Sequence, residues 1–233
     1  MMRRAAFVLL FCSIPVSGWC VCQVPQPRMV CAEYFQSQAV VVAKLVDIKS
    51  VPKQWPDYFI YKLVTVRRIR GNASPTFELF EGNDSGRAPF DWKVGEQYLL
   101  FLDEPSQYTR NLPSIDGCGN SSPLAEAAKT LKKIRAISEF GDRGLISGMV
   151  GTDSWTTGVS NVAIRITGNH RTFLAETNAK GRYTKVVPVG VYRVTATKGR
   201  MNIPAEPFSY ESPSHVVIHP GGCAQVQFSD TQH

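Results

Sequence analysis

The chain has 233 residues and a formal net charge of +7 at pH 7. This length fits one large domain or two ordinary ones, and the charge is a mild basic bias. Basic side chains gather at 67–70 and between Lys129 and Arg135, where they could meet a phosphate backbone or an anionic glycan. Because no nucleic-acid motif accompanies them, we interpret both clusters as solvated faces and exclude a nucleic-acid-binding protein.

The first 18 residues have the three-part pattern of a secretory signal peptide. Arg3 and Arg4 form a basic start, Ala5–Cys12 forms an apolar core, and a turn-prone exit ends at Gly18. The apolar run is far shorter than the roughly 20 residues that span a bilayer, so we expect no membrane span. Cleavage after Gly18 would leave Trp19 first and remove two arginines, which lowers the formal charge to +5. The expected product is an exported protein, extracellular or periplasmic.

Residues 19–140 carry a pattern of strands followed by a helix. Ser122 is the predicted N-cap of that helix, and Pro123 suits its first turn. Apolar residues follow at helical spacing and are predicted to pack on the strands, while the lysines between them face solvent. These packing residues are Leu124, Leu131 and Ile134. The predicted strands are Val40–Asp47, Tyr58–Val66, Thr76–Phe80 and Gln97–Leu102.

Residues 144–230 have a pattern of strands only, after a change of character at 140–144. Short alternating segments recur at roughly ten-residue intervals with turn residues between them, which indicates an antiparallel β-sandwich. The predicted fold class of the whole chain is therefore mainly β, with seven strands in this second domain. The seven are Leu145–Val150, Asn161–Thr167, Thr172–Thr177, Gly181–Val186, Val191–Thr197, Val216–Ile218 and Ala224–Phe228.

Five cysteines remain after the predicted cleavage, namely Cys20, Cys22, Cys31, Cys118 and Cys223. In an oxidising compartment they are expected to pair, yet an odd number leaves one over, and five cysteines can form two bonds in fifteen ways. Cys20 and Cys22 are one residue apart, which is not the spacing that places two thiolates on one zinc ion, and no second such pair exists. We therefore predict disulfides and no metal site.

A set of short motifs in the first domain points to a known family. Gly95–Phe101, preceded by a turn and followed by a single cysteine, is the motif on which we rely most. The others are Cys20-x-Cys22, Cys31, Ala39–Lys44, Arg70-Gly71 and Cys118 shortly before the helix. With these motifs, residues 19–140 resemble the netrin-like module shared with tissue inhibitors of metalloproteinases. The resemblance implies an OB-type five-stranded barrel with a C-terminal helix.

The second domain carries its own set of motifs. They are Ile146-x-Gly148-x-Val150, Gly158-Val159, Ala175–Tyr183 and Pro188–Val194. Asn178 and Gly181, within the third motif, suit a hairpin turn. With these motifs, residues 144–230 resemble the carboxypeptidase regulatory-like, prealbumin-like β-sandwich. The resemblance implies a stabilising or positioning module, since the peptidase itself is absent.

The netrin-like pattern also implies disulfide partners. By that pattern Cys22 pairs with Cys118, and this is the pair that we favour. The pattern expects a partner for Cys20 before the Gly95 strand, but 86–92 contains no cysteine. Cys31 could then bond to Cys20, or to Cys223 and lock the two domains together. We leave these two alternatives open.

We predict an exported, non-enzymatic binding or structural protein that uses its two β-domains as interaction surfaces for an unknown protein or glycan partner. An OB-type barrel offers a concave strand face and loops for ligands. The alternative is a metalloprotease inhibitor of the tissue-inhibitor type, acting through the N-terminal Cys-x-Cys segment, in which a first-residue cysteine chelates the catalytic zinc. That chemistry requires Cys20 to come first and to be held by a disulfide. Trp19 precedes it, however, and its expected partner is missing.

A third hypothesis, a hydrolase, finds few candidate residues. The histidines are His170, His215, His219 and His233. His215 and His219 bracket a predicted strand and would lie about 13 Å apart at strand rise, too far to bind one metal ion. No Gly-x-Ser-x-Gly elbow, phosphate loop or His-Glu-x-x-His helix is present. We therefore predict no catalytic, cofactor-binding or metal-binding residue.

Aromatic residues near turns are a further lead to a ligand. Trp55, Trp92 and Trp155 sit in or beside predicted turns, where an indole ring can stack on a sugar or on a partner side chain. The alternative is that these rings pack in the core or as lids over it.

Overall fold

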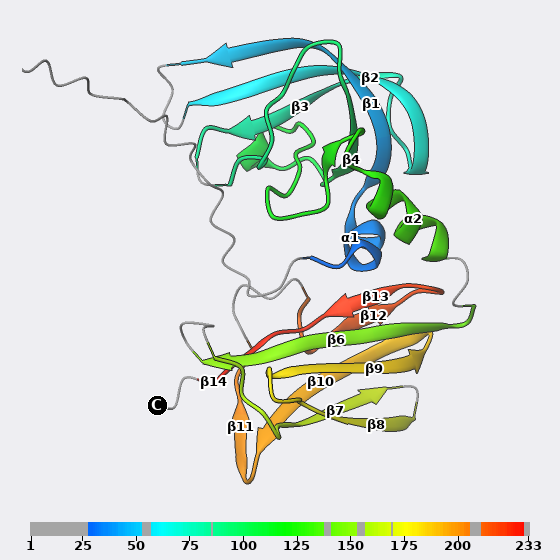
Figure 1. Cartoon of the computed structure of the whole chain (residues 1–233), viewed down its shortest axis with the longest axis vertical. Helices are drawn as coiled ribbons and strands as arrows, with labels where there is room; N and C mark the ends of the chain where they lie inside the picture. The colour runs from blue at the N-terminus through cyan, green and yellow to red at the C-terminus, as the bar shows by residue number, and fades with distance from the viewer. Residues whose placement is uncertain are drawn as a thin grey trace, which may run out of the picture.

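The computed structural model describes residues 28–52, 57–84, 86–137, 141–152, 157–168, 170–205 and 211–230. The chain folds into two β-domains, each with hydrophobic clusters of its own (Figure 1). The first domain contains α1 (Val30–Gln36), β1 (Ala39–Val51), β2 (Tyr58–Gly71), β3 (Thr76–Gly82), β4 (Gln97–Leu102), the short 3-10 helix η1 (Gln107–Thr109), β5 (Ser122–Pro123) and α2 (Ala128–Ala136). The second contains β6 (Arg143–Thr152), β7 (Ala163–Gly168), β8 (Arg171–Glu176), β9 (Arg182–Pro188), β10 (Gly190–Lys198), β11 (Met201–Ile203), β12 (Val216–Ile218), β13 (Cys223–Gln225) and β14 (Phe228–Asp230).

The strands of the first domain form one antiparallel sheet in the order β3-β2-β1-β4-β5. The four longer strands match the predicted ones, but the predicted barrel does not close, because no pairing joins β3 to β5 among the described residues. β5 has two residues, and Pro123 has no N–H to donate to a further strand. The segment after β4 covers this opening, where the Phe80 N–H donates to the Pro113 carbonyl (2.9 Å).

Residues 39–43 of β1 and most of β4 are buried on both faces, which accounts for the continuous apolar runs in these segments. On one face, Val41 and Leu100 pack in a cluster with Tyr61 of β2. On the opposite face, Val40 packs in a cluster with Ile134 of α2. The sheet therefore has helices on one side and aromatic side chains on the other.

Helix α2 packs as predicted but begins later in the chain. The predicted N-cap and first turn, Ser122–Pro123, form β5 instead, because they pair with β4, and the helix begins at Ala128. Ile134 is buried, and Leu124 and Leu131 are partly buried in the same cluster, which confirms the predicted packing face. The lysines of α2 are exposed, also as predicted.

Helix α1 is an element that the sequence patterns did not predict. It has seven residues, and its N-cap residue Met29 makes no side-chain cap hydrogen bond, so neither apolar periodicity nor a capping signal marks it. Val30 places it in the cluster shared by β1 and α2. Tertiary packing rather than local propensity therefore stabilises α1.

The second domain is a sandwich of two sheets. One sheet has the order β11-β10-β7-β8, with β12 also paired to β10, and the other has the order β13-β6-β14, with β9 also paired to β6. Inward and outward side chains alternate along the strands. In β7, for example, Ile164 and Ile166 are fully buried while Arg165 and Thr167 are exposed.

Two details of the predicted sandwich are wrong. The described part of this domain has nine strands rather than seven, because β11 is additional and the predicted last strand divides into β13 and β14. The sandwich is also not wholly antiparallel, since β13 and β14 both pair with β6 in parallel. The division falls at 226–227, where the Gln227 Oε1 accepts the Met149 N–H (2.9 Å). Alternation shows which face is buried but not the direction of a strand, so the sequence could not indicate this parallel pairing.

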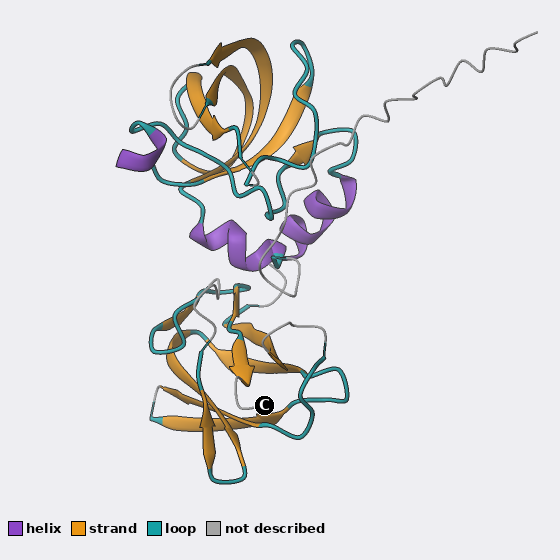
Figure 2. Ribbon diagram, turned by 90° about the vertical axis from the view of Figure 1, so that its left-hand side faces the viewer, coloured by secondary structure: helices purple, strands orange, loops and turns teal. Residues whose placement is uncertain are grey.

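The two α-helices lie between the domains. Figure 2 shows both on the side of the five-stranded sheet that faces the sandwich, and α1 contacts both α2 and β13. The start of the first domain therefore lies beside the end of the second. No helix in the described part of the chain is long and apolar enough to cross a membrane.

Candidate functional site

A disulfide joins the two domains. Cys31 of α1 is bonded to Cys223 at the start of β13, with Cα atoms 5.4 Å apart and a sequence separation of 192. Beside this bond, the Met29 N–H donates to the Gln225 Oε1 (2.6 Å). Of the two partners that remained open for Cys31, Cys20 and Cys223, the structure has the second. The domains are thus linked covalently at a second point besides the chain connection between them.

Aromatic stacking adds a second link across the junction. The ring of Phe35 in α1 stacks on His219 of the second domain, with centroids 4.7 Å apart and planes inclined by 17°. The Arg70 guanidinium lies 5.7 Å from the Phe35 centroid and donates to the main-chain carbonyls of Phe35 (3.2 Å) and Ser37 (2.6 Å). The prediction of a solvated basic face holds for 67–68, which are exposed, but is wrong for Arg70.

A buried ionic network holds α1 to the loop after β4. The Oε2 atom of Glu33 accepts hydrogen bonds from the main-chain N–H (2.7 Å) and the Nδ2 (2.6 Å) of Asn120. Arg28 Nη1 lies 3.8 Å from Glu33 Oε1 and 3.0 Å from Asp116 Oδ2. Gly119 leaves room for this carboxyl group, since a Cβ there would lie 2.2 Å from Glu33 Oε1. The network therefore depends on close packing as well as on charge.

Carboxyl groups near the junction hold their protons more tightly than exposed ones do. Burial raises the pKa of Glu33 from 4.5 to about 7, although the charge of Arg28 opposes the shift. Burial also raises the pKa of Asp103, again against Arg28. Glu211 of the second domain accepts a hydrogen bond from Gln36, and burial raises the pKa of Glu211 to about 7. The charge at this junction is consequently sensitive to pH near neutrality.

A cavity of about 220 Å³ opens beside the disulfide. Its wall consists of residues from α1 and α2, with Lys133 at one side and Gly221 of the second domain at another. Gly221 has a φ of +69°, and a Cβ there would lie 1.7 Å from the Ile137 carbonyl oxygen, so only glycine lets this turn meet the end of α2. The cavity is smaller than the roughly 300 Å³ at which small-molecule sites begin, and we interpret it as a packing gap.

Trp92 is the one predicted stacking residue within the described ranges. It is 9% exposed, its ring lies 4.4 Å from that of Tyr61, and its Nε1 donates to the Glu81 Oε1 (3.3 Å). These contacts favour the packing alternative for Trp92. Trp55 and Trp155 lie outside the described residues.

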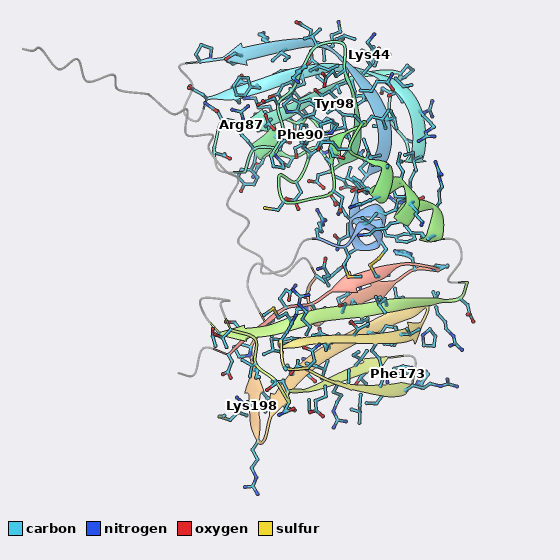
Figure 3. All side chains as sticks on the ribbon, viewed as in Figure 1. Lys44, Arg87, Phe90, Tyr98, Phe173 and Lys198 are labelled. Carbon is cyan, nitrogen blue, oxygen red and sulfur yellow. A yellow bond between two sulfur atoms is a disulfide. The ribbon has the colours of Figure 1, made fainter. Side chains whose placement is uncertain are left out.

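Glu81 is the buried carboxyl group around which this aromatic cluster is arranged. It accepts hydrogen bonds from the Tyr61 hydroxyl (2.6 Å) and the Ala88 N–H (2.9 Å), and the Arg87 Nε lies 3.4 Å from its Oε2. Arg87 lies in the first domain (Figure 3). Its guanidinium is also 4.7 Å from the centroid of the Phe59 ring. Because both carboxylate oxygens have partners within the domain, we assign this cluster a structural role.

The other predicted cysteine sites lie largely outside the described ranges. Cys118 is disulfide-bonded, and its N–H donates to the Asp116 Oδ1 (2.8 Å). Cys20 and Cys22 fall outside the described residues, so the favoured pair of Cys22 with Cys118 stays a prediction. The inhibitor hypothesis, which depends on Cys20, stays one as well.

The histidines occupy separate places in the second domain. His219 stacks on Phe35, His215 is exposed immediately before β12, and His170 has a φ of 57° at a turn. His233 lies outside the described residues. Within the described ranges, no group of three or more His, Cys, Asp or Glu side chains could hold a metal ion.

Sequence reasoning missed the non-covalent part of the junction. Phe35 and Glu33 belong to an acidic-aromatic stretch that is conspicuous in the sequence, but no spacing rule connects them with His219 or Asn120. A signal existed for the disulfide alone, because cysteines can be counted and their pairings enumerated.

Comparisons with known proteins add little to this description. Neither a family model nor a curated protein matches the chain. Among solved structures, the chain is similar to the dioxygenase domain of a dioxygenase carbohydrate-binding protein fusion from the cellulolytic bacterium Streptomyces sp. SirexAA-E. The identity is 13%, the match covers 39% of this chain and 80% of that chain, and the TM-score is 0.27. A likeness with so low a TM-score supports no argument about activity.

Proposed function

We propose that the protein is an exported, non-enzymatic binding or structural protein whose two β-domains act together as interaction surfaces. The observation that carries this proposal is the Cys31–Cys223 disulfide between the domains. The stack of Phe35 on His219 lies at the same junction. Two domains held in one orientation present a single composite surface, which suits the recognition of an extended partner.

Export is supported by two independent features of the chain. Disulfides persist in oxidising compartments and are rare in the reducing cytosol. Residues 1–18 have the pattern of a signal peptide. Both point to an extracellular or periplasmic location.

The partner that we propose is a protein or a glycan. The netrin-like resemblance of residues 19–140 and the carboxypeptidase regulatory-like resemblance of residues 144–230 are both to modules that bind or position other molecules. The positive formal charge of the chain favours an acidic partner.

The test is to recover the protein with its partner from the compartment that it occupies. The chain is expressed with its own leader, cell fractions are probed for it, and the exported fraction is captured under native conditions. We expect the mature protein in that fraction, the Cys31–Cys223 bond in a non-reducing peptide map, and a defined protein or polysaccharide partner. The Cys31→Ser/Cys223→Ser variant, which frees the domains, should recover less of that partner.

Two results would overturn the proposal. One is a location in the reducing cytoplasm, with both cysteines as free thiols. The other is a hydrolytic activity of the purified protein that disappears when His215 or His219 is replaced.

A further inference from the structure

One face of the sandwich is open to solvent over several strands. In β10, Tyr192 and Val194 are buried while Arg193 and Thr195 are exposed, and β7 presents Arg165 in the same way. β7 and β8 lie at the end of the sandwich away from the first domain (Figure 1). The outward side chains of β7, β8 and β10 therefore form an accessible face.

The register of the strands places two arginines and two threonines in a compact block at the centre of this face. Arg193 is directly opposite Thr167, and Thr195 is directly opposite Arg165. The two arginines are consequently diagonal neighbours on adjacent strands, with Cβ atoms about 7 Å apart. Each arginine has a threonine hydroxyl beside it. We call these four residues the arginine–threonine block.

The positive charges of this block have no acidic partner within the described part of the chain. None of the ion pairs there includes Arg165 or Arg193. The nearest acidic residue by register is Glu176 of β8, which is opposite Ala163 and is therefore a diagonal neighbour of Arg165. Among the described residues it forms no ion pair with either arginine. Two like charges at diagonal positions repel each other, though less than two charges directly opposite each other. An anion placed between the two guanidinium groups would offset that repulsion.

We propose that the arginine–threonine block binds an acidic polysaccharide. A guanidinium group forms paired hydrogen bonds with a carboxylate or a sulfate, and threonine hydroxyls both donate to and accept from sugar hydroxyls. The block lies on the exposed outer side of a sheet, whereas small ligands need a concave site that buries most of their surface. An extended polyanion can contact both arginines at once. This inference rests on the proposed function as an exported binding protein and names its ligand class.

The test compares two variants that remove the same charge from different exposed sites. Arg165→Gln/Arg193→Gln changes the block, and Arg67→Gln/Arg68→Gln changes an exposed pair on β2 of the other domain. Binding of the full-length mature protein to heparin and to polygalacturonate is measured by calorimetry at about 0.15 M salt, with neutral dextran as the control polymer. We expect the block variant to lose affinity by about tenfold or more and the β2 variant to lose much less.

A third variant separates hydrogen bonding from charge. Thr167→Val/Thr195→Val keeps both arginines, and we expect it to weaken binding by a smaller factor of about threefold. Equal losses in the two arginine variants would mean non-specific attraction and would overturn the inference. So would a folded wild-type protein that binds neither acidic polymer. Cell fractionation and the non-reducing peptide map test the proposed function independently of these binding measurements. A failure of this inference can therefore be distinguished from a failure of the proposed function.

Discussion

The side chain of Glu33 is 1% exposed. Ionisation of its carboxyl group destabilises the folded state. Burial raises its pKa from 4.5 to about 7, so the folded chain binds this proton more tightly than the unfolded chain does. The stability that follows from this shift is fully present below pH 4.5 and is lost as the pH rises to about 7. A shift of this size corresponds to on the order of 3 kcal/mol.

We predict that Glu33→Gln removes most of this pH dependence. The glutamine carbonyl can still accept the hydrogen bonds of Asn120, but the side chain does not ionise. Relative to wild type, the free energy of unfolding of the variant should therefore increase by about 3 kcal/mol between pH 4.5 and pH 8. Urea unfolding at a series of pH values measures this difference directly.

Two further variants test whether the change in pH dependence comes from burial of the carboxyl group. Glu104→Gln replaces an exposed glutamate of the same domain, and its stability curve should parallel that of wild type. Glu211→Gln should act in the same direction as Glu33→Gln, because burial also raises the pKa of Glu211 to about 7. Parallel curves for Glu33→Gln and wild type would show that Glu33 does not titrate in this range.

At the scale of elements, strand β6 holds one sheet of the sandwich together, since β9, β13 and β14 all pair with it. Gly148 lies on β6 between the residues that pair with β13 and those that pair with β14. A Cβ there would lie 1.8 Å from the Val226 carbonyl oxygen and 2.7 Å from the Tyr183 hydroxyl. That hydroxyl donates to the same carbonyl (2.8 Å), and Tyr183 is buried. Neither neighbour can move without loss of packing.

We predict that Gly148→Ala lowers the free energy of unfolding by about 2 kcal/mol or more. The reason is that the added methyl group displaces backbone and a buried ring rather than a flexible side chain. The matched control is Gly86→Ala, where a Cβ would meet the Asp84 Oδ1 at 3.1 Å, and its effect should stay within about 0.5 kcal/mol. Equal effects of the two substitutions in urea unfolding would show that position 148 of β6 tolerates a side chain.

The elements differ in how far the sequence could predict them, and the difference lies in what stabilises each one. β4 and β12 have the predicted bounds, because alternation or a continuous apolar run marks them. α1 and β5 were not predicted, since packing against α2 and pairing with β4 hold them in place. At the junction, the sequence indicated two partners for Cys31, but nothing in it brought Phe35 to His219. Contacts between segments that are distant in the chain produce no periodic pattern in the sequence.

At the scale of the whole molecule, the disulfide is the strongest link across the junction. Closing a loop of 192 residues restricts the unfolded chain by about 5 kcal/mol on a chain-entropy estimate. The Phe35–His219 stack contributes about 1 kcal/mol beyond its buried area, and the hydrogen bond from Met29 to Gln225 contributes about the same. Without the covalent link, the domains are held by these contacts together with the hydrogen bond from Gln36 to Glu211 and the packing of Gly221 against Ile137. We expect this non-covalent set to be weaker than the disulfide.

We predict that Cys31→Ser/Cys223→Ser leaves both domains folded but lets them separate. Each domain keeps its own hydrophobic clusters, so circular dichroism should not change. Small-angle X-ray scattering should instead report a larger radius of gyration and a broader distribution of distances. His219→Ala removes the stack but keeps the disulfide, so its scattering should match that of wild type. Combining the three substitutions should enlarge the particle further, because neither the disulfide nor the stack then holds the domains together. If the double serine variant scatters like wild type, the non-covalent contacts alone fix the orientation of the domains, and the composite surface does not require an oxidising compartment.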